Sequence, residues 1–187
     1  MTTTTIPTEL TGDYTVDASH SHFGFVARHA MITKVKGAFR EFTGGGHFDA
    51  ADPTRSTIEL TVAVDSVDTG NADRDAHLRT NDFFDLGNFP EIRFVSTAIA
   101  PSGQDVFSVT GDLTIKGVTK PVTMEVEYTG AAEDPFGNNR IGLEGSLTVN
   151  RKDWGLDWNV PLGAGGVLVS EKVTLEFDVS AVKNESA

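Results

Sequence analysis

Histidine is the residue type in this sequence best suited to proton transfer and metal binding near neutral pH, and His20 and His22 have the most suggestive spacing. An H-x-H pair on a strand places two imidazoles on one face, which is a common beginning of a zinc site. However, Phe23 and Phe25 alternate with this pair, so the two histidines belong to the solvent-facing side of the strand. No third ligand follows nearby, and we expect no metal site here.

A third histidine, His29, shares the parity of Phe23 and Phe25 at the end of the same strand. At the rim of an apolar face, it is either a hydrogen-bonded core residue or a group that meets the polar end of a ligand. The sequence leaves both alternatives open.

Residues 71–81 form the one convincing helix of the sequence, and they carry a fourth candidate, His77. Arg74, His77 and Leu78 are spaced i, i+3 and i+4, so they share one face of the helix. That face offers a cation, a titratable imidazole and an apolar anchor. It either meets a ligand or caps a β-structure as an ordinary amphipathic helix. A weaker turn of helix is expected at residues 30–33.

Aromatic residues follow these candidates along the chain. Phe83 and Phe84 come directly after the helix, and we expect them to dock it onto the rest of the fold. Trp154 and Trp158 lie close to two basic residues further on. This segment forms either a stacking platform or a plug at the end of a barrel.

The sequence contains no cysteine, no G-x-S-x-G elbow and no Walker loop. The glycine-rich stretch at residues 163–166 precedes a strand, so it lacks the helix N-terminus that phosphate binding requires. No arrangement of residues indicates nucleophilic or acid–base catalysis. We therefore expect a protein that is not an enzyme and that has no resident cofactor or metal.

Composition indicates an acidic protein of 187 residues, with 15 Lys and Arg against 27 Asp and Glu and a net charge of −12. Such a surface repels phosphate backbones and anionic lipid headgroups, so nucleic acid is not an expected partner. We expect one domain at residues 13–182 between loose tails at 1–12 and 183–187. With no signal peptide or transmembrane segment in the sequence, we expect a cytoplasmic protein.

Alternation of apolar and polar residues with period two runs through most of the chain. Val122, Met124, Val126 and Tyr128 form one such apolar face, and similar runs occur at residues 58–64, 107–115, 143–149 and 173–179. Strands with one wet and one dry face are typical of antiparallel sheets. Eight or nine of them joined by short turns predict a sandwich or a closed barrel.

Several of the 19 glycines fall on the apolar faces, where a bulky core residue is expected. They are Gly37, Gly44, Gly46, Gly111 and Gly145. Glycine fills no volume in a strand and weakens it. Either strongly bent barrel strands need glycine at these corners, or the missing side chains leave an internal cavity for a ligand. The two explanations are compatible.

Short segments between about Tyr14 and Val182 together resemble the YceI-like proteins, a polyisoprenoid-binding family, in their order along the chain. The segments are Asp17–Ser21, Arg28–His29, Thr33–Phe39, Asp65–Gly70, Arg74–Leu78, Asp82–Asp85, Pro90–Phe94, Gly111–Val122, Asn150–Gly155 and Val169–Val173. No single segment is diagnostic, but the ordered set is specific.

The resemblance implies an all-β fold, an antiparallel lipocalin-like β-barrel of about eight strands with one short helix around residues 71–81. It also implies a long apolar pocket that holds an isoprenoid chain, a quinone or a similar amphiphilic lipid, and it suggests a homodimer. Many members of this family are exported, and this chain departs from them in lacking a signal peptide.

We therefore expect a non-catalytic carrier or sequestering protein for an isoprenoid-type lipid, acting in transport or stress response. The expected ligand-binding residues are Phe23, Phe25, His29, Phe39, Phe42, Arg74, His77, Leu78, Phe83, Phe84, Phe94, Phe107 and Trp154. One cation and two imidazoles suit a neutral quinone or amide head at least as well as a pyrophosphate.

Two alternatives from other classes remain. The first is an enzyme for a small apolar substrate, with His77 or His29 as general base and a carboxylate within hydrogen-bond distance of that imidazole. The second is a structural module whose barrel is solid.

Overall fold

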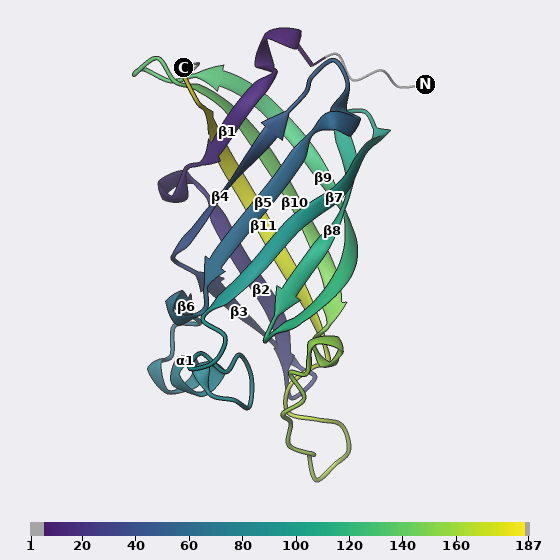
Figure 1. The fold of residues 1–187 in the computed structure, drawn as a ribbon. Coiled ribbons are helices and arrows are strands. Elements are labelled where there is room, and N and C mark those ends of the chain that lie inside the picture. The colour runs from purple at the N-terminus through teal and green to yellow at the C-terminus, as the bar shows by residue number, and fades with distance from the viewer. Residues whose placement is uncertain (1–5, 186–187) are drawn as a thin grey trace.

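Eight antiparallel strands close into a barrel, which confirms the fold that the family resemblance implies and one of the two architectures that the alternation predicts (Figure 1). The computed structural model describes residues 6–185. Around the barrel the strands follow the order β1-β4-β5-β7-β8-β9-β10-β11, and β1 pairs with β11 to complete the ring.

The strands vary widely in length, and short 3₁₀ turns connect several of them. The strands are β1 (Gly12–Val16), β2 (His22–His29), β3 (Thr33–Phe39), β4 (Phe42–Phe48), β5 (Thr57–Ala63), β6 (Val67–Asp68), β7 (Glu91–Gly103), β8 (Val106–Ile115), β9 (Val118–Glu133), β10 (Asn139–Asn150) and β11 (Lys172–Lys183). The helix α1 spans Ala72–Arg79, and the 3₁₀ turns are η1 (Thr8–Leu10), η2 (Ala18–His20), η3 (Pro53–Arg55), η4 (Val64–Ser66) and η5 (Arg151–Trp154).

Strand β11 closes the ring because it changes partner along its length. Its C-terminal end pairs with β1, where Tyr14 lies opposite Lys183. Its N-terminal half pairs with β2, where Phe23 lies opposite Phe177. Strands β2, β3 and β6 therefore form a side ladder that continues the sheet from β11.

Helix α1 confirms the helix expected at residues 71–81. The side chain of Asn71 caps it by accepting a hydrogen bond from the Arg74 backbone N–H at 3.0 Å. Buried Asp75 accepts two further bonds, from the backbone N–H and the hydroxyl of Thr69, at 2.9 and 2.6 Å. These contacts hold a helix of only two turns against the chain that precedes it.

The helical turn expected at residues 30–33 is wrong, because this segment is the tight turn between β2 and β3. Ala30 and Met31 both adopt positive φ, at 51° and 62°. The Ile32 N–H donates to the His29 carbonyl oxygen at 3.0 Å. This is the geometry of a type I′ hairpin, whose twist matches that of the flanking strands.

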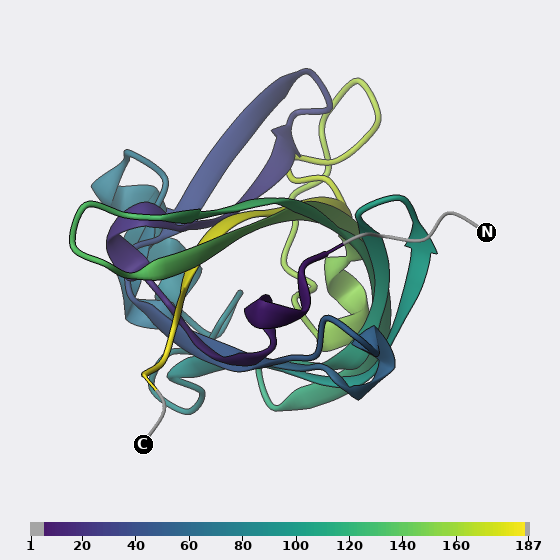
Figure 2. The ribbon, with the colours of Figure 1, turned by 90° about the horizontal axis from the view of Figure 1, so that it is seen from above.

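Side chains and short turns cover both ends of the barrel. Seen from above, η1 lies within the upper opening (Figure 2). Ile6 and Leu10 are buried there, and the Tyr14 hydroxyl donates to the Leu10 carbonyl oxygen at 2.7 Å. At the other end, buried Phe83 and Trp154 come from the segment after α1 and from η5.

Phenylalanine rings lie over three of the inward glycines. A Cβ atom at Gly37 would collide with the ring of Phe25, its cross-strand partner, and one at Gly145 would meet Phe177 in the same way at 2.6 Å. At Gly111 the ring is that of Phe94. Rings therefore fill the space at these three positions, so the cavity alternative does not explain these glycines.

Close backbone approach explains the glycines of β4. A Cβ at Gly44 would lie 2.8 Å from the carbonyl oxygen of Glu59, and one at Gly46 would collide with that of Thr57. These contacts fit the expectation that bent barrel strands need glycine.

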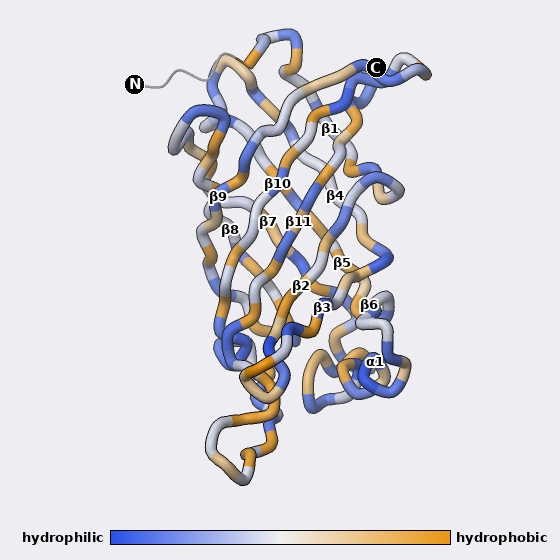
Figure 3. Tube along the Cα trace, turned by 180° about the vertical axis from the view of Figure 1, so that it is seen from behind, coloured by the Kyte–Doolittle hydropathy of each residue, from blue (hydrophilic) through white to orange (hydrophobic). Residues whose placement is uncertain are grey.

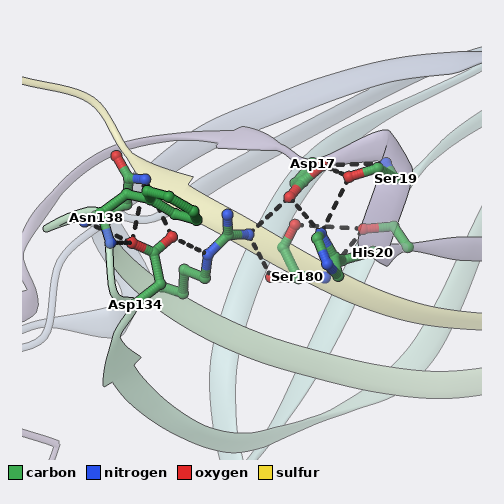
Figure 4. Close-up of polar contacts among 9 residues, drawn as sticks. Asp17, Ser19, His20, Asp134, Asn138 and Ser180 are labelled. Atoms are coloured by element: carbon green, nitrogen blue, oxygen red, sulfur yellow. Dashed lines mark hydrogen bonds and ion pairs between the residues drawn. The ribbon is translucent and has the colours of Figure 1, made fainter.

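A half-buried ion network outside the barrel joins its first and last strands to the β9–β10 hairpin (Figure 4). Arg140 on β10 donates to Asp17 at 2.7 Å and to Asp134 at 2.8 Å. Hydrogen bonds from Ser19 and then from Arg140 hold the pKa of Asp17 well below its usual range. Asn138, and after it Arg140, lower the pKa of Asp134 in the same way.

Replacing Gly111 with alanine should lower the free energy of unfolding by about 1–3 kcal/mol, because the new methyl group overpacks the wall. Besides the Phe94 ring, it would meet the Val95 carbonyl oxygen at 2.6 Å, which cannot rotate away. Gly87→Ala is the matched control, since a Cβ there meets nothing within 4 Å. Urea denaturation measures both variants, and equal stability would contradict the packing argument.

The Arg140 network should make the protein acid-sensitive. Because the folded-state pKa values of both carboxyls are lowered, their contribution is complete above the unfolded pKa of about 4 and is lost as pH falls below it. Arg140→Gln should lower the melting temperature at pH 7 and flatten its decline between about pH 5 and 2. Arg40→Gln, which breaks the exposed pair with Asp68, is the control for thermal melts. An equal loss in both variants would refute a special role for Arg140.

Candidate functional site

A cavity of about 210 Å³ lies inside the barrel and is the candidate functional site. All eight barrel strands and β2 contribute to its lining. The lining is almost entirely apolar, since the inward residues of the alternating strands point into it. Val122, Met124 and Val126 supply one side from β9, with Leu143 from β10 and Leu175 from β11 nearby. A dry cavity of this kind suits an apolar ligand.

Three of the thirteen expected ligand-binding residues line this cavity, and they are Phe23, Phe94 and Phe107. Phe177 packs against Phe23 with ring centroids 6.4 Å apart, and it also lines the cavity. The sequence list passed over Phe177, although it lies on the apolar face that alternation identifies.

Three other expected residues, Phe25, Phe39 and Phe42, pack on the side ladder and its neighbours. Phe39 and Phe42 are buried in a second apolar cluster, and Phe25 packs against it. The cluster still bears on the cavity, because the ring of Phe42 stands edge-on to that of Phe23 at 4.6 Å. Phe42 therefore fixes the orientation of a ring that lines the cavity. Phe84 packs on the same cluster through Phe39, at 5.8 Å.

Trp154 and Phe83 close the lower end of the barrel. Both are buried, and the indole N–H of Trp154 donates to the Leu113 carbonyl oxygen at 3.0 Å. Leu113 itself lines the cavity, so this bond ties the plug to the cavity wall. Leu78 from α1 packs partly buried against the same core. These contacts match the plug alternative for the tryptophan segment.

Buried Arg151 supports this plug from behind. Its guanidinium donates to the carbonyl oxygens of Ser170, at 2.9 Å, and of Leu156, and it lies 5.9 Å from the centre of the Phe83 ring. Burial lowers the pKa of Arg151 from its ordinary value. The backbone carbonyls thus accept the hydrogen bonds of the guanidinium, and Arg151 is not among the residues that line the cavity.

None of the three groups expected to meet a polar head lines the cavity. His29 is exposed at the end of β2, where it bridges to Val169. Arg74 is turned toward Thr69 and donates to its hydroxyl and carbonyl oxygens, both at 2.7 Å. His77 stands edge-on to Trp158, with ring centroids 4.5 Å apart.

His77 does meet one condition of the enzyme alternative. Its Nε2 lies 2.8 Å from the Asp82 carboxylate, which orients the imidazole. Neither residue lines the cavity, and both side chains are more than a third exposed. Within residues 6–185, no group of three or more His, Asp or Glu side chains could hold a metal ion.

Two tyrosines that were not among the expected ligand-binding residues belong to the lining. They are Tyr14 and Tyr128. Burial raises the pKa of both phenols above the ordinary value, and the charge of Asp105 adds to the effect at Tyr128. Both hydroxyls therefore stay neutral at physiological pH. The sequence could have identified Tyr128, because it belongs to the apolar face of β9 and also carries a hydroxyl group.

Comparison with known proteins gives a consistent picture. The family model described as YceI-like domain matches residues 14–181. A UPF0312 protein of Shewanella denitrificans is 38% identical over 173 residues, covering 91% of this chain and 87% of its own length. A UPF0312 protein of Pseudomonas savastanoi is 35% identical over 173 residues, covering 91% and 85%.

Solved structures share the fold. Burkholderia cenocepacia BcnA has a TM-score of 0.77 at 29% identity, with 88% of this chain and 98% of that chain covered. The YCEI protein of Campylobacter jejuni has a TM-score of 0.73 at 28% identity, covering 84% and 90%. A polyisoprenoid binding domain from Saccharophagus degradans has a TM-score of 0.70 at 17% identity, covering 91% and 98%, and this likeness supports the fold alone. None of the helices described here is long and apolar enough to cross a membrane.

Removing the indole N–H of Trp154 should loosen the lower plug. Trp154→Phe leaves the Leu113 carbonyl without its donor in a buried site, and we expect a loss of about 1–3 kcal/mol in the free energy of unfolding. Trp158→Phe, at a half-buried ring of the same segment, is the control and should cost less. Chemical denaturation distinguishes them, and a larger loss in the control would reject this account of the plug.

Proposed function

The chain belongs to the YceI-like domain family, and we propose that it binds an isoprenoid chain, a quinone or a similar amphiphilic lipid inside its barrel without chemically changing it. The observation that carries the proposal is the apolar cavity enclosed by the barrel strands. The name of the Saccharophagus degradans domain, which refers to polyisoprenoid binding, agrees with this ligand class.

Burial of the apolar chain supplies the affinity. Each Å² of apolar surface removed from water contributes roughly 25 cal/mol, and a preformed cavity spares most of the cost of ordering the protein. Branched isoprenoid units match a lining of branched and aromatic side chains such as Leu60, Val109 and Phe107.

The polar groups of the lining favour a neutral head. Tyr14 and Tyr128 are neutral phenols, and among the described residues neither Lys nor Arg lines the cavity. His47 lines it as well, but its Nδ1 is held by Asp13 at 2.8 Å. A diphosphate brings several negative charges and would meet no cation there, whereas a quinone carbonyl needs one neutral donor. The Tyr14 proton is already donated to the Leu10 carbonyl oxygen, so we place the head beside Tyr128 and the chain toward Phe23 and Leu175.

Extraction of the purified protein with organic solvent, followed by mass spectrometry, tests for a bound lipid. Binding of geranylgeraniol, of geranylgeranyl diphosphate and of a benzoquinone with a short isoprenoid tail then tests the head group. We expect the two neutral ligands to bind more tightly than the diphosphate. Tighter binding of the diphosphate would overturn the head-group assignment.

Filling the cavity should weaken ligand binding. Val122→Trp places an indole in the lining, and we expect at least a roughly tenfold loss of affinity for the quinone probe because the chain loses its space. Val118→Trp, four residues earlier on the same strand and 36% exposed, is the matched control and should bind normally. Circular dichroism checks that both variants fold. Undiminished binding by a folded Val122→Trp protein would refute binding inside the barrel.

A further inference from the structure

The hairpin of β2 and β3 carries a basic face in an otherwise acidic protein. Arg28 lies opposite Lys34, and Val26 lies opposite Lys36, so these four side chains share one side of the sheet. Val26 also pairs with Thr174 of β11, which extends the same side to Lys172. We call Arg28, Lys34, Lys36 and Lys172 the basic hairpin face. These residues line one surface groove together with Met31.

The cations of this face are available to a partner. Within residues 6–185, the ammonium groups of Lys34, Lys36 and Lys172 form no ion pair. Two carboxylates share the groove, and one of them, Glu171, is already paired with Lys152 at 2.9 Å. Positive charge therefore prevails locally although the whole chain carries −12. At physiological ionic strength, charges beyond about 8 Å are screened, so the local charge decides what approaches.

Large apolar side chains stand exposed at the tip of the same hairpin. Met31 is 55% exposed and Ile32 is 78% exposed, both in the tight turn between β2 and β3. Val160, on the neighbouring loop, is 42% exposed. This loop is joined to the hairpin by the hydrogen bond from the Ala30 N–H to the Leu168 carbonyl oxygen, at 2.7 Å. Figures 1 and 3 show the loop, with its apolar stretches, projecting beyond the end of the barrel beside β2 and β3.

We propose that this end of the molecule docks on a lipid bilayer that contains anionic lipids, with Met31 and Ile32 entering the headgroup region and the basic hairpin face meeting the lipid charges. Apolar side chains on a protruding tip, with basic side chains behind them, are the pattern of interfacial membrane binding. The tight turn, with positive φ at Ala30 and Met31, presents the two side chains at the tip of the hairpin.

A second copy of this chain fits the face less well. In a twofold symmetric dimer the same surface meets itself, and the basic hairpin faces would then repel each other. An anionic bilayer instead complements the charge and accepts a projecting apolar tip. The proposal concerns the outer surface, so it holds whether or not the barrel contains a lipid.

The absence of cysteine from the sequence allows a clean insertion assay. A single cysteine at Ile32→Cys is labelled with an environment-sensitive fluorophore, and Phe136→Cys, at an 88% exposed residue of the β9–β10 turn, is the matched control. With vesicles of phosphatidylcholine and phosphatidylglycerol, we expect a several-fold rise in emission and a blue shift for the label at 32 only. Equal responses at both positions, or none at either, would overturn the proposal.

Vesicle flotation tests the charge. Lys34→Gln with Lys36→Gln should weaken binding roughly tenfold or more, since each basic side chain near an anionic surface contributes about a factor of five. Arg93→Gln with Lys120→Gln removes the same charge from exposed positions on other strands and should bind as the parent does. Binding should fall with added salt and be weak on phosphatidylcholine alone. A parent protein that does not float with anionic vesicles, or a self-association that Ile32→Ser abolishes, would refute membrane docking and, in the second case, assign the tip to a second copy.

Discussion

Closure of the sheet into a ring is the constraint on which the rest of this structure depends, because it commits every inward side chain to one shared interior. A large aromatic ring on one strand then fits only where the neighbouring strand has a very small residue. Glycines of the barrel strands meet this need, with Phe94 lying over Gly111 and Phe177 over Gly145. Both rings line the cavity that remains inside the barrel.

The interior is almost uniformly apolar, although two tyrosines, Tyr14 and Tyr128, are among its lining residues. The buried plug of Phe83 and Trp154 closes one end. Arg151 has the one buried guanidinium among the described residues, and it donates hydrogen bonds to backbone carbonyls behind that plug. Among the described residues that line the cavity there is no Lys or Arg, so an anionic group placed there would meet no basic side chain.

Alternation predicted the fold well because parity is a local property that each strand displays on its own. It predicted the site less well, since parity says which face is apolar but not which volume that face borders. Phe25 and Phe39 share inward parity with Phe23, yet the side ladder directs them into a separate cluster. His29 lies beyond the barrel at the end of β2, where parity no longer points to the interior.

The tight turn between β2 and β3 could not be predicted from the sequence for another reason. Positive φ at Ala30 and Met31 is uncommon for residues with side chains, and nothing in their type announces it. The expectation of a helical turn followed ordinary propensity, and the register of β2 and β3 overrode it. Helix α1, by contrast, carried its own local capping residue, Asn71, and was predictable.

The pairing of β1 with β11 joins strands from the two ends of the chain, and this has a consequence for how the protein is made. Of the barrel strands, β1 leaves the ribosome first and β11 last, so the ring stays open until β11 has been made. Until then β1 and β10 each present an unpaired edge, and such edges are prone to association with other chains. Contacts between residues so distant in sequence also form slowly. During synthesis, closure of the barrel by β11 therefore competes with aggregation through the unpaired edges of β1 and β10.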